Sequence, residues 1–148
     1  YSSMKKVIAI DPGHNKCGLL LADLDCFLAI DGKISLNSSV INLINYWREN
    51  HSVELILLGD GTTSKYWQSA LLAENISPIQ LVDERMTTLR ARERYLEIFP
   101  PEFLAKLIPK GLILPPKNLD VIVSLILIED YFQVKLRWSK SIELKIWP

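Results

Sequence analysis

The stretch that most constrains the fold is residues 7–10, an apolar run of valine, isoleucine and alanine that ends at Asp11. Apolar, β-branched residues without alternation are typical of a strand buried on both faces of a sheet. Pro12 fixes φ and Gly13 tolerates positive φ, so we expect a turn directly after the acid. An unpaired buried charge is costly, so Asp11 is expected to meet solvent, a cation or hydrogen-bond donors at the sheet edge.

Three strands in succession are expected to open the sheet as an antiparallel meander. The second covers residues 17–21 and the third begins with the apolar residues 26–30. Gly18 marks a bend or a close approach of another part of the backbone. Residues 31–32, Asp-Gly, leave two alternatives open, because they suit either another turn before residues 33–36 or one continuous, bent third strand.

The rest of the chain alternates helical and strand patterns. In chain order we expect a helix capped by residues 37–39 and ending near residue 50, a strand at 54–59, a helix at 66–75, a strand at 79–83, a helix at 87–99 and a helix at 119–132. This order predicts an α/β fold with a mixed five-stranded sheet. Three antiparallel strands come first, βα units follow, and helices cover both faces.

The domain boundaries follow from the same pattern. We expect one domain over residues 4–133, followed by a tail at 134–148 that forms an extra strand or an oligomer contact, a homodimer included. Residues 1–3 are interpreted as an artificial extension, and no signal peptide is recognised. The longest apolar run, residues 121–128, is too short to span a bilayer of about 30 Å. We therefore expect a cytoplasmic protein that does not cross a membrane.

The composition is that of an ordinary globular protein. The 148 residues are 49% hydrophobic, and 17 basic residues balance 17 acidic ones. Since the net charge is zero, any binding of nucleic acid depends on a local basic patch. The two cysteines, Cys17 and Cys26, have no metal-type spacing and are expected to be small buried side chains in a reducing compartment.

Three acids follow or begin predicted elements: Asp11 after the first strand, Glu84 after the fifth, and Asp120 in the first turn of the last helix. Each alone is typical of a solvated residue or a helix cap. If the sheet brings them together, their repulsion requires a bound cation or shared protons. Oxygen ligands without His or Cys favour Mg²⁺ or Mn²⁺. Such a site suits a two-metal hydrolysis of phosphodiester bonds.

Three motifs occur in the order found in a known family. Residues 11–18 read D-P-G-H-N-K-C-G, residues 82–88 read V-D-E-R-M-T-T, and Asp120 precedes V-I-V-S. They resemble the D-P-G-x-x-x-x-G, V-D-E-R-[LM]-T-T and D-x-x-A-A motifs of the YqgF/RuvX family. The resemblance extends from Met4 to about Phe132, and the second motif is its most specific part.

The resemblance implies a ribonuclease H-like fold and a metal-dependent nuclease. Asp11, Glu84 and Asp120 are then the catalytic metal ligands. Asp83 is either a weaker candidate for a ligand or a residue that caps or orients Arg85. The implied substrate is nucleic acid. The family has been proposed to mature the 5′ end of pre-16S ribosomal RNA in ribosome biogenesis, and resolution of Holliday junctions in DNA is the alternative.

Basic residues near these acids are candidates for contact with nucleic acid. They are Lys16, where the family commonly has arginine, and the arginines Arg85, Arg90, Arg92 and Arg94. Arg90 and Arg94 are four residues apart and share a helix face, so they suit non-specific contact with the phosphate backbone. The alternative is a solvated face partly paired with Glu93 and Glu97. Lys106, Lys110 and Lys117 are further candidates, and His14 is either a surface residue or an aid to proton transfer.

Two other functional classes stay open at this point. Residues 58–63, L-G-D-G-T-T, also suit a phosphate-binding turn in an ATP-binding domain of the actin type, although such proteins normally need two domains. A non-catalytic binding or assembly module of the same fold is the other alternative. The neutral net charge, a short loop at 59–64 and the hydrophobic tail permit it. Val123-Ser124, where the family has a pair of alanines, leaves open an enzyme of reduced activity.

Overall fold

The computed structural model describes residues 5–85, 87–100 and 119–148 of the chain. Its strands are β1 (Lys6–Asp11), β2 (Lys16–Asp23), β3 (Leu28–Leu36), β4 (Val53–Gly59), β5 (Ile79–Val82), β6 (Arg137–Trp138) and β7 (Ile146–Trp147). Its helices are α1 (Val40–Asn50), α2 (Ser64–Ala73), α3 (Thr87–Ile98) and α4 (Leu119–Phe132), with a 3₁₀ turn η1 (Asn37–Ser39) before α1. The proline- and glycine-rich stretch, with Lys106, Lys110 and Lys117, lies outside the described residues.

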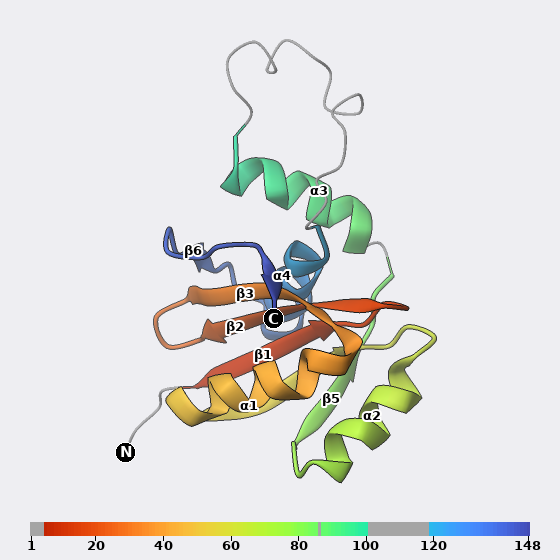
Figure 1. The fold of residues 1–148 in the computed structure, drawn as a ribbon. Coiled ribbons are helices and arrows are strands. Elements are labelled where there is room, and N and C mark those ends of the chain that lie inside the picture. The colour runs from red at the N-terminus through yellow and green to blue at the C-terminus, as the bar shows by residue number, and fades with distance from the viewer. Residues whose placement is uncertain (1–4, 86, 101–118) are drawn as a thin grey trace.

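All seven strands belong to one mixed sheet, whose main path is β5-β4-β1-β2-β3-β6 (Figure 1). β1, β2 and β3 form the predicted antiparallel meander, and β4 and β5 run parallel to β1. The α/β class and the mixed sheet are thus confirmed. The predicted number of five strands is too small, because the tail adds β6 and β7, two-residue strands that both pair with β3.

β3 is one continuous strand, which settles the alternative left open at residues 31–32. Leu21 pairs with Asp31 and Ala22 pairs with Ala29, so Ile30 is an extra residue in β3. Such a bulge bends a strand without ending it. The Asp-Gly dipeptide therefore lies within the strand rather than in a turn.

Both faces of β1 are buried, as its unbroken apolar pattern predicts. Ile8 and Ile10 point to a core that they share with α1 and α2, whose largest buried side chains are Trp47 and Trp67. The alternate residues of β1 face the opposite core, which α4 covers. Successive side chains of a strand point to opposite faces, so β1 requires a helical layer on each side.

α4 is buried around nearly its whole circumference. One side packs on the sheet, and Ile122, Val123 and Ile126 face Ala91 of α3. α3 thus forms an outer layer over α4, as the ribbon shows (Figure 1). Within residues 5–85, 87–100 and 119–148, none of the helices combines the length and apolarity needed to cross a membrane.

Two details differ from the sequence predictions. Cys17 is buried as expected, whereas Cys26 lies exposed in the β2–β3 turn. α1 starts after residues 37–39, but no side-chain hydrogen bond caps it. The side chain of Asn37 is used elsewhere, as described below.

Candidate functional site

Asp11, the last residue of β1, lies between two glycines on the neighbouring strands. Gly18 of β2 is its antiparallel partner. On the other side, Ile10 pairs with Leu58, so the following residue, Gly59, is level with Asp11 at the end of β4. Neither neighbour carries a side chain, and both sides of Asp11 are therefore open to groups from other elements.

The side chain of Glu84 lies in the space left beside Gly59. Since β4 lies between β1 and β5, a side chain that follows β5 must cross the end of β4 to reach Asp11. A Cβ atom on Gly59 would lie 2.2 Å from Glu84 Oε1, and a Cβ atom on Gly61 would lie 2.7 Å from Oε2. The Glu84 carboxylate therefore lies directly against these two glycines, in space that any other residue would fill.

The Glu84 side chain lies close enough to Asp11 to share a hydrogen bond with it when Asp11 carries a proton. Burial raises the pKa of Asp11 to about 9, and the hydrogen bond and the negative charges of Glu84 and Asp120 act in the same direction. In the part of the chain that the structure describes, none of these three acids forms an ion pair. Like charges held together in this way favour a bound proton or cation.

The backbone of Asp120 lies in the space left beside Gly18. A Cβ atom on Gly18 would lie 2.4 Å from both the carbonyl carbon and the carbonyl oxygen of Asp120. Ser124 Oγ, one turn further along α4, donates a buried hydrogen bond of 2.8 Å to the carbonyl oxygen of Gly18. Burial raises the pKa of Asp120, and the positive charge of Lys16 opposes this shift. The close backbone approach predicted at Gly18 is thus made by the first turn of α4.

The turn before α3 fixes the backbone of Glu84. Asp60 Oδ1 accepts a hydrogen bond of 3.2 Å from the Glu84 backbone N–H, and Thr87 Oγ1 donates one of 2.6 Å to the Glu84 carbonyl oxygen. Asp83 is directed to Arg85, and its Oδ1 accepts a hydrogen bond of 2.8 Å from the Arg85 backbone N–H. The predicted pairing of Asp83 with Arg85 is confirmed.

Asn37 holds the turn that follows Asp11. Its Nδ2 donates to the carbonyl oxygens of His14 at 2.8 Å and Gly13 at 3.3 Å, and its Oδ1 accepts from Cys17 Sγ at 3.3 Å. Burial raises the pKa of the Cys17 thiol to about 11, so the thiol stays protonated and can donate. Sequence analysis assigned Asn37 to helix capping and missed this role, which depends on a contact between residues far apart in the chain.

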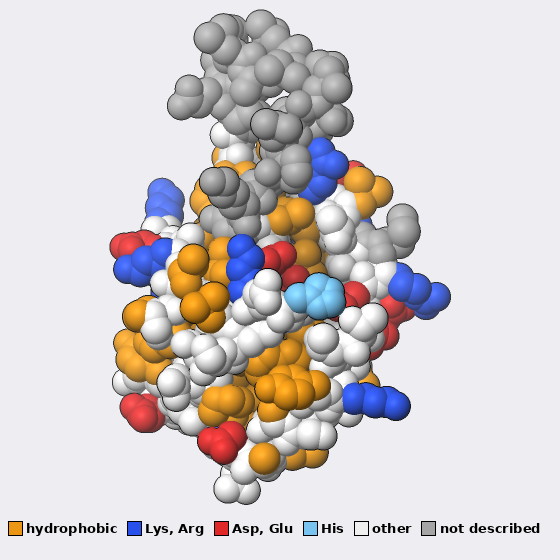
Figure 2. Space-filling view, turned by 45° about the vertical axis from the view of Figure 1, so that its right-hand side comes forward, with side chains coloured by type: hydrophobic (Ala, Val, Ile, Leu, Met, Phe, Trp, Pro, Cys, Tyr) orange, Lys and Arg blue, Asp and Glu red, His pale blue; other side chains and the backbone are white. Residues whose placement is uncertain are grey.

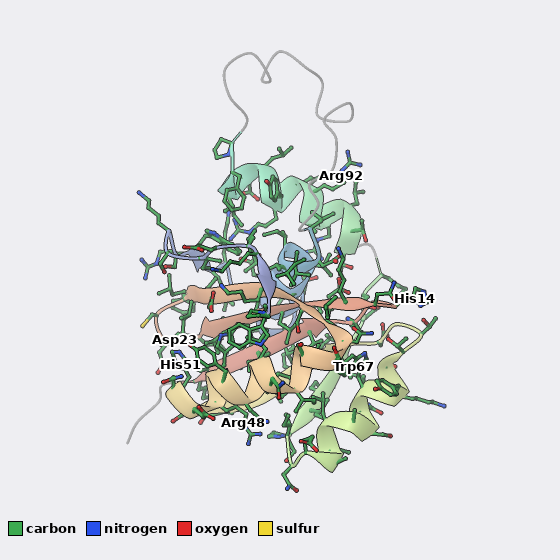
Figure 3. All side chains as sticks on the ribbon, viewed as in Figure 1. His14, Asp23, Arg48, His51, Trp67 and Arg92 are labelled. Carbon is green, nitrogen blue, oxygen red and sulfur yellow. The ribbon has the colours of Figure 1, made fainter. Side chains whose placement is uncertain are left out.

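The exposed face beside these acids carries two of the predicted basic residues. Lys16 is exposed at the start of β2, close enough to influence Asp120, and Arg85 is exposed and paired with Asp83 at 2.7 Å. His14 is exposed in the turn after β1, at the far right of the sheet in Figure 3. Figure 2 turns that side forward and shows acidic side chains next to a histidine at the surface.

Arg90 and Arg94 do not form the exposed basic patch that their spacing predicts. They share a face of α3, but that face packs on α4, where Arg90 pairs with Asp130. Arg94 is only 10% exposed, binds Glu129 through two nitrogen atoms at 2.9 and 3.1 Å, and donates to the carbonyl oxygen of Leu136. Arg94 therefore connects α3, α4 and the tail.

The donor set suits a hard cation, although the three acids do not converge on one point. In residues 5–85, 87–100 and 119–148 no group of three or more Asp, Glu, His or Cys side chains is arranged to hold a metal ion. Asp11 and Glu84 are in contact, and Asp120 lies on the other side of Asp11. Mg²⁺ needs only one or two carboxylates when water and substrate phosphates complete its coordination, so the carboxylate pair fits such an ion.

Neither a protein-family model nor a curated protein sequence matches this chain.

Proposed function

We propose that this chain is a divalent-metal-dependent nuclease of ribonuclease H-like fold that hydrolyses phosphodiester bonds in structured nucleic acid. The observation that carries the proposal is the contact between Asp11 and Glu84 across Gly59. Two elements distant in the sequence place acids together, and two glycines leave the space for it. Such a pair destabilises the protein unless it serves to hold a proton or a cation.

Asp11 and Glu84 would hold a Mg²⁺ or Mn²⁺ ion through their carboxylate oxygens, with Asp120 adjacent on the Gly18 side. When bound, the ion would supply Lewis acidity, both to activate water and to neutralise charge on the phosphate. Binding requires that the pair lose the proton it shares, because a metal ligand must be deprotonated. The glycines at positions 18 and 59 leave the space in which Glu84 and Asp120 lie beside Asp11.

Lys16 and Arg85 would position the nucleic-acid backbone. Both are exposed, Lys16 lies close enough to influence Asp120, and Arg85 directly follows Glu84. Both cations can contact phosphate oxygens without reading sequence. Their contribution to binding would be electrostatic and would decrease with salt. Arg94 has no part in this role, because its guanidinium is committed to Glu129.

For the substrate, the motifs shared with the YqgF/RuvX family favour precursor ribosomal RNA, cut near the 5′ end of pre-16S rRNA in the cytoplasm. A four-way DNA junction is the second candidate. Both present phosphodiester bonds in a structured backbone, so the same carboxylates would serve either one.

The test is cleavage of a labelled precursor-rRNA fragment and of a four-way DNA junction in Mg²⁺, Mn²⁺ or EDTA. We expect metal-dependent cleavage that decreases by about 100-fold or more in Asp11→Asn, since several kcal/mol of transition-state stabilisation depend on the ion. Asp25→Asn is the matched control, because Asp25 is an exposed acid in the β2–β3 turn, beyond the opposite end of β2 from Lys16. Full activity of Asp11→Asn would refute the site, and no cleavage by the folded wild type would favour a binding module.

A further inference from the structure

A second site lies between α1, β3 and the tail. It is a cavity of about 640 Å³, within the range of pockets that bind small molecules. Its lining includes Asp31, Lys33, Tyr46, His51 and Trp147. His51 and His14 lie at opposite ends of the sheet in Figure 3, so the His51 end of this cavity is remote from the turn after Asp11.

Aromatic rings form one side of the cavity. The Tyr46 and Trp147 rings pack together with their centroids 4.9 Å apart and their planes tilted by 40°. Tyr46 is 48% exposed, so much of its surface is accessible. Trp47, behind them, is fixed by a hydrogen bond of 3.1 Å from its Nε1 to Asp31 Oδ2. The lining therefore offers a rigid apolar base and a more accessible ring on which a flat molecule can stack.

The charged groups of the cavity are balanced. Lys33 Nζ binds Asp31 at 2.8 Å and the carbonyl oxygen of Glu143 at 3.1 Å, and Lys145 Nζ binds Glu143 at 3.2 Å. Burial and the charge of Lys6, whose Nζ lies 3.2 Å from His51 Nδ1, lower the pKa of His51, so its ring is uncharged at neutral pH. Since both lysines that line the cavity are already paired, this set favours an uncharged ligand over a phosphate.

One donor of the cavity residues has no acceptor. Within the described part of the chain, Trp147 Nε1 is the buried side-chain nitrogen or oxygen that lacks a hydrogen-bond partner. A buried donor without a partner costs free energy, and an acceptor atom on a ligand would recover it. The atom is buried in the absence of a ligand, so contact with it requires a local movement of the side chains that line the cavity.

We propose that this cavity binds a nucleobase, which is flat, uncharged and rich in hydrogen-bond donors and acceptors. The base stacks on the Tyr46–Trp147 side and accepts a hydrogen bond from Trp147 Nε1. Asn50, His51 and Ser141, which also line the cavity, supply further polar contacts. The inference extends the proposed function, because a base held here fixes one position of a substrate strand, but a free nucleoside tests the cavity independently of cleavage.

The first experiment is calorimetric titration of the wild-type chain with adenosine, ribose 5-phosphate and a short oligoadenylate. We expect saturable binding of adenosine with a millimolar or lower Kd, and none of ribose 5-phosphate. Tighter binding of the oligoadenylate identifies the base of a strand as the ligand, and binding of adenosine alone identifies a free nucleoside. Absence of adenosine binding, or equal binding of ribose 5-phosphate, overturns the proposal.

Variants then locate the site. Trp147→Phe keeps an aromatic ring and removes the N–H, and Tyr46→Ala removes the accessible ring; each is expected to weaken adenosine binding about tenfold. Tyr66→Ala is the matched control, because Tyr66 is 65% exposed on α2 and does not line the cavity. If Trp147→Phe does not fold, Tyr46→Ala still tests the assignment, because the Tyr46 side chain is half-exposed. Unchanged affinity in both variants, or in the one that folds, overturns the assignment.

Asp11→Asn separates this proposal from the proposed function. It should bind adenosine as the wild type does, although it no longer cuts nucleic acid. If the wild type binds adenosine but cuts nothing, the nuclease proposal alone fails. If it cuts but does not bind adenosine, the cavity proposal alone fails.

Discussion

Glu84 reaches Asp11 only because Gly59 has no side chain: a Cβ atom at Gly59 would lie 2.2 Å from Glu84 Oε1. On the other side of Asp11, Gly18 leaves space for the backbone of Asp120. The site therefore depends on two glycines at the ends of neighbouring strands as much as on its acids.

Gly59→Ala should displace the Glu84 carboxylate from Asp11. A shift of about 1 Å in a catalytic group can reduce a rate about 100-fold, and we expect a loss of that size in metal-dependent cleavage. Ser52→Ala is the control, because Ser52 is exposed and precedes the opposite end of β4 from Gly59. Circular dichroism should show that Gly59→Ala is folded. Undiminished cleavage by the folded variant would show that Glu84 need not lie at Gly59.

Gly18→Ala should destabilise the whole fold. The added Cβ would meet the backbone of Asp120, and backbone yields less readily than the end of a flexible side chain. Overpacking of this kind costs about 1–3 kcal/mol in the free energy of unfolding. Urea denaturation of the variant and the wild type measures the difference. A change below a few tenths of a kcal/mol would mean that α4 moves freely away from β2.

The stability of the metal-free protein should decrease as pH rises. Asp11 has an ordinary pKa of 3.8 and a raised value of about 9 in the folded chain, so the folded state binds more protons between these values. The resulting stabilisation is complete below about pH 4 and is lost as pH approaches 9. Unfolding in EDTA at pH 5, 7 and 9 measures the slope, which Asp11→Asn should flatten. An equal slope in that variant would contradict the assignment.

Arg94→Ala should cost far more stability than Arg90→Ala. Loss of Arg94 leaves Glu129 buried without its partner, at a cost of about 3–5 kcal/mol, whereas the more exposed pair of Arg90 contributes below about 1 kcal/mol. Parallel urea titrations compare the two variants. Similar small losses in both would place Arg94 at the surface, as its sequence position alone predicts.

Lys16→Ala and Arg85→Ala should reduce the salt dependence of nucleic-acid binding. Each lost phosphate contact lowers the slope of log K against log salt by about 0.7–0.9. Binding of the metal-free Asp11→Asn background at several salt concentrations gives this slope without cleavage. Lys140→Ala, an exposed lysine of the tail, is the control. An unchanged slope would show that neither cation touches the backbone.

The sequence alone determined the local elements and named the candidate acids. The run at residues 7–10 predicted a strand buried on both faces, and α4 occupies residues 119–132 as expected. Such predictions succeed because strand and helix periodicity is a property of neighbouring residues. The choice between a turn and a bent strand at residues 31–32 required the pairing with β2, which lies outside that local pattern.

Only the tertiary structure decided how the acids meet and which arginines are accessible. The strand order places β4 between β1 and β5, so Gly59 became the crossing point for Glu84. Arg94 has the spacing of a surface residue, yet α4 covers it and Glu129 neutralises it. Both outcomes arise from contacts between residues distant in the chain, because burial and charge pairing depend on what packs opposite a side chain rather than on its neighbours in sequence.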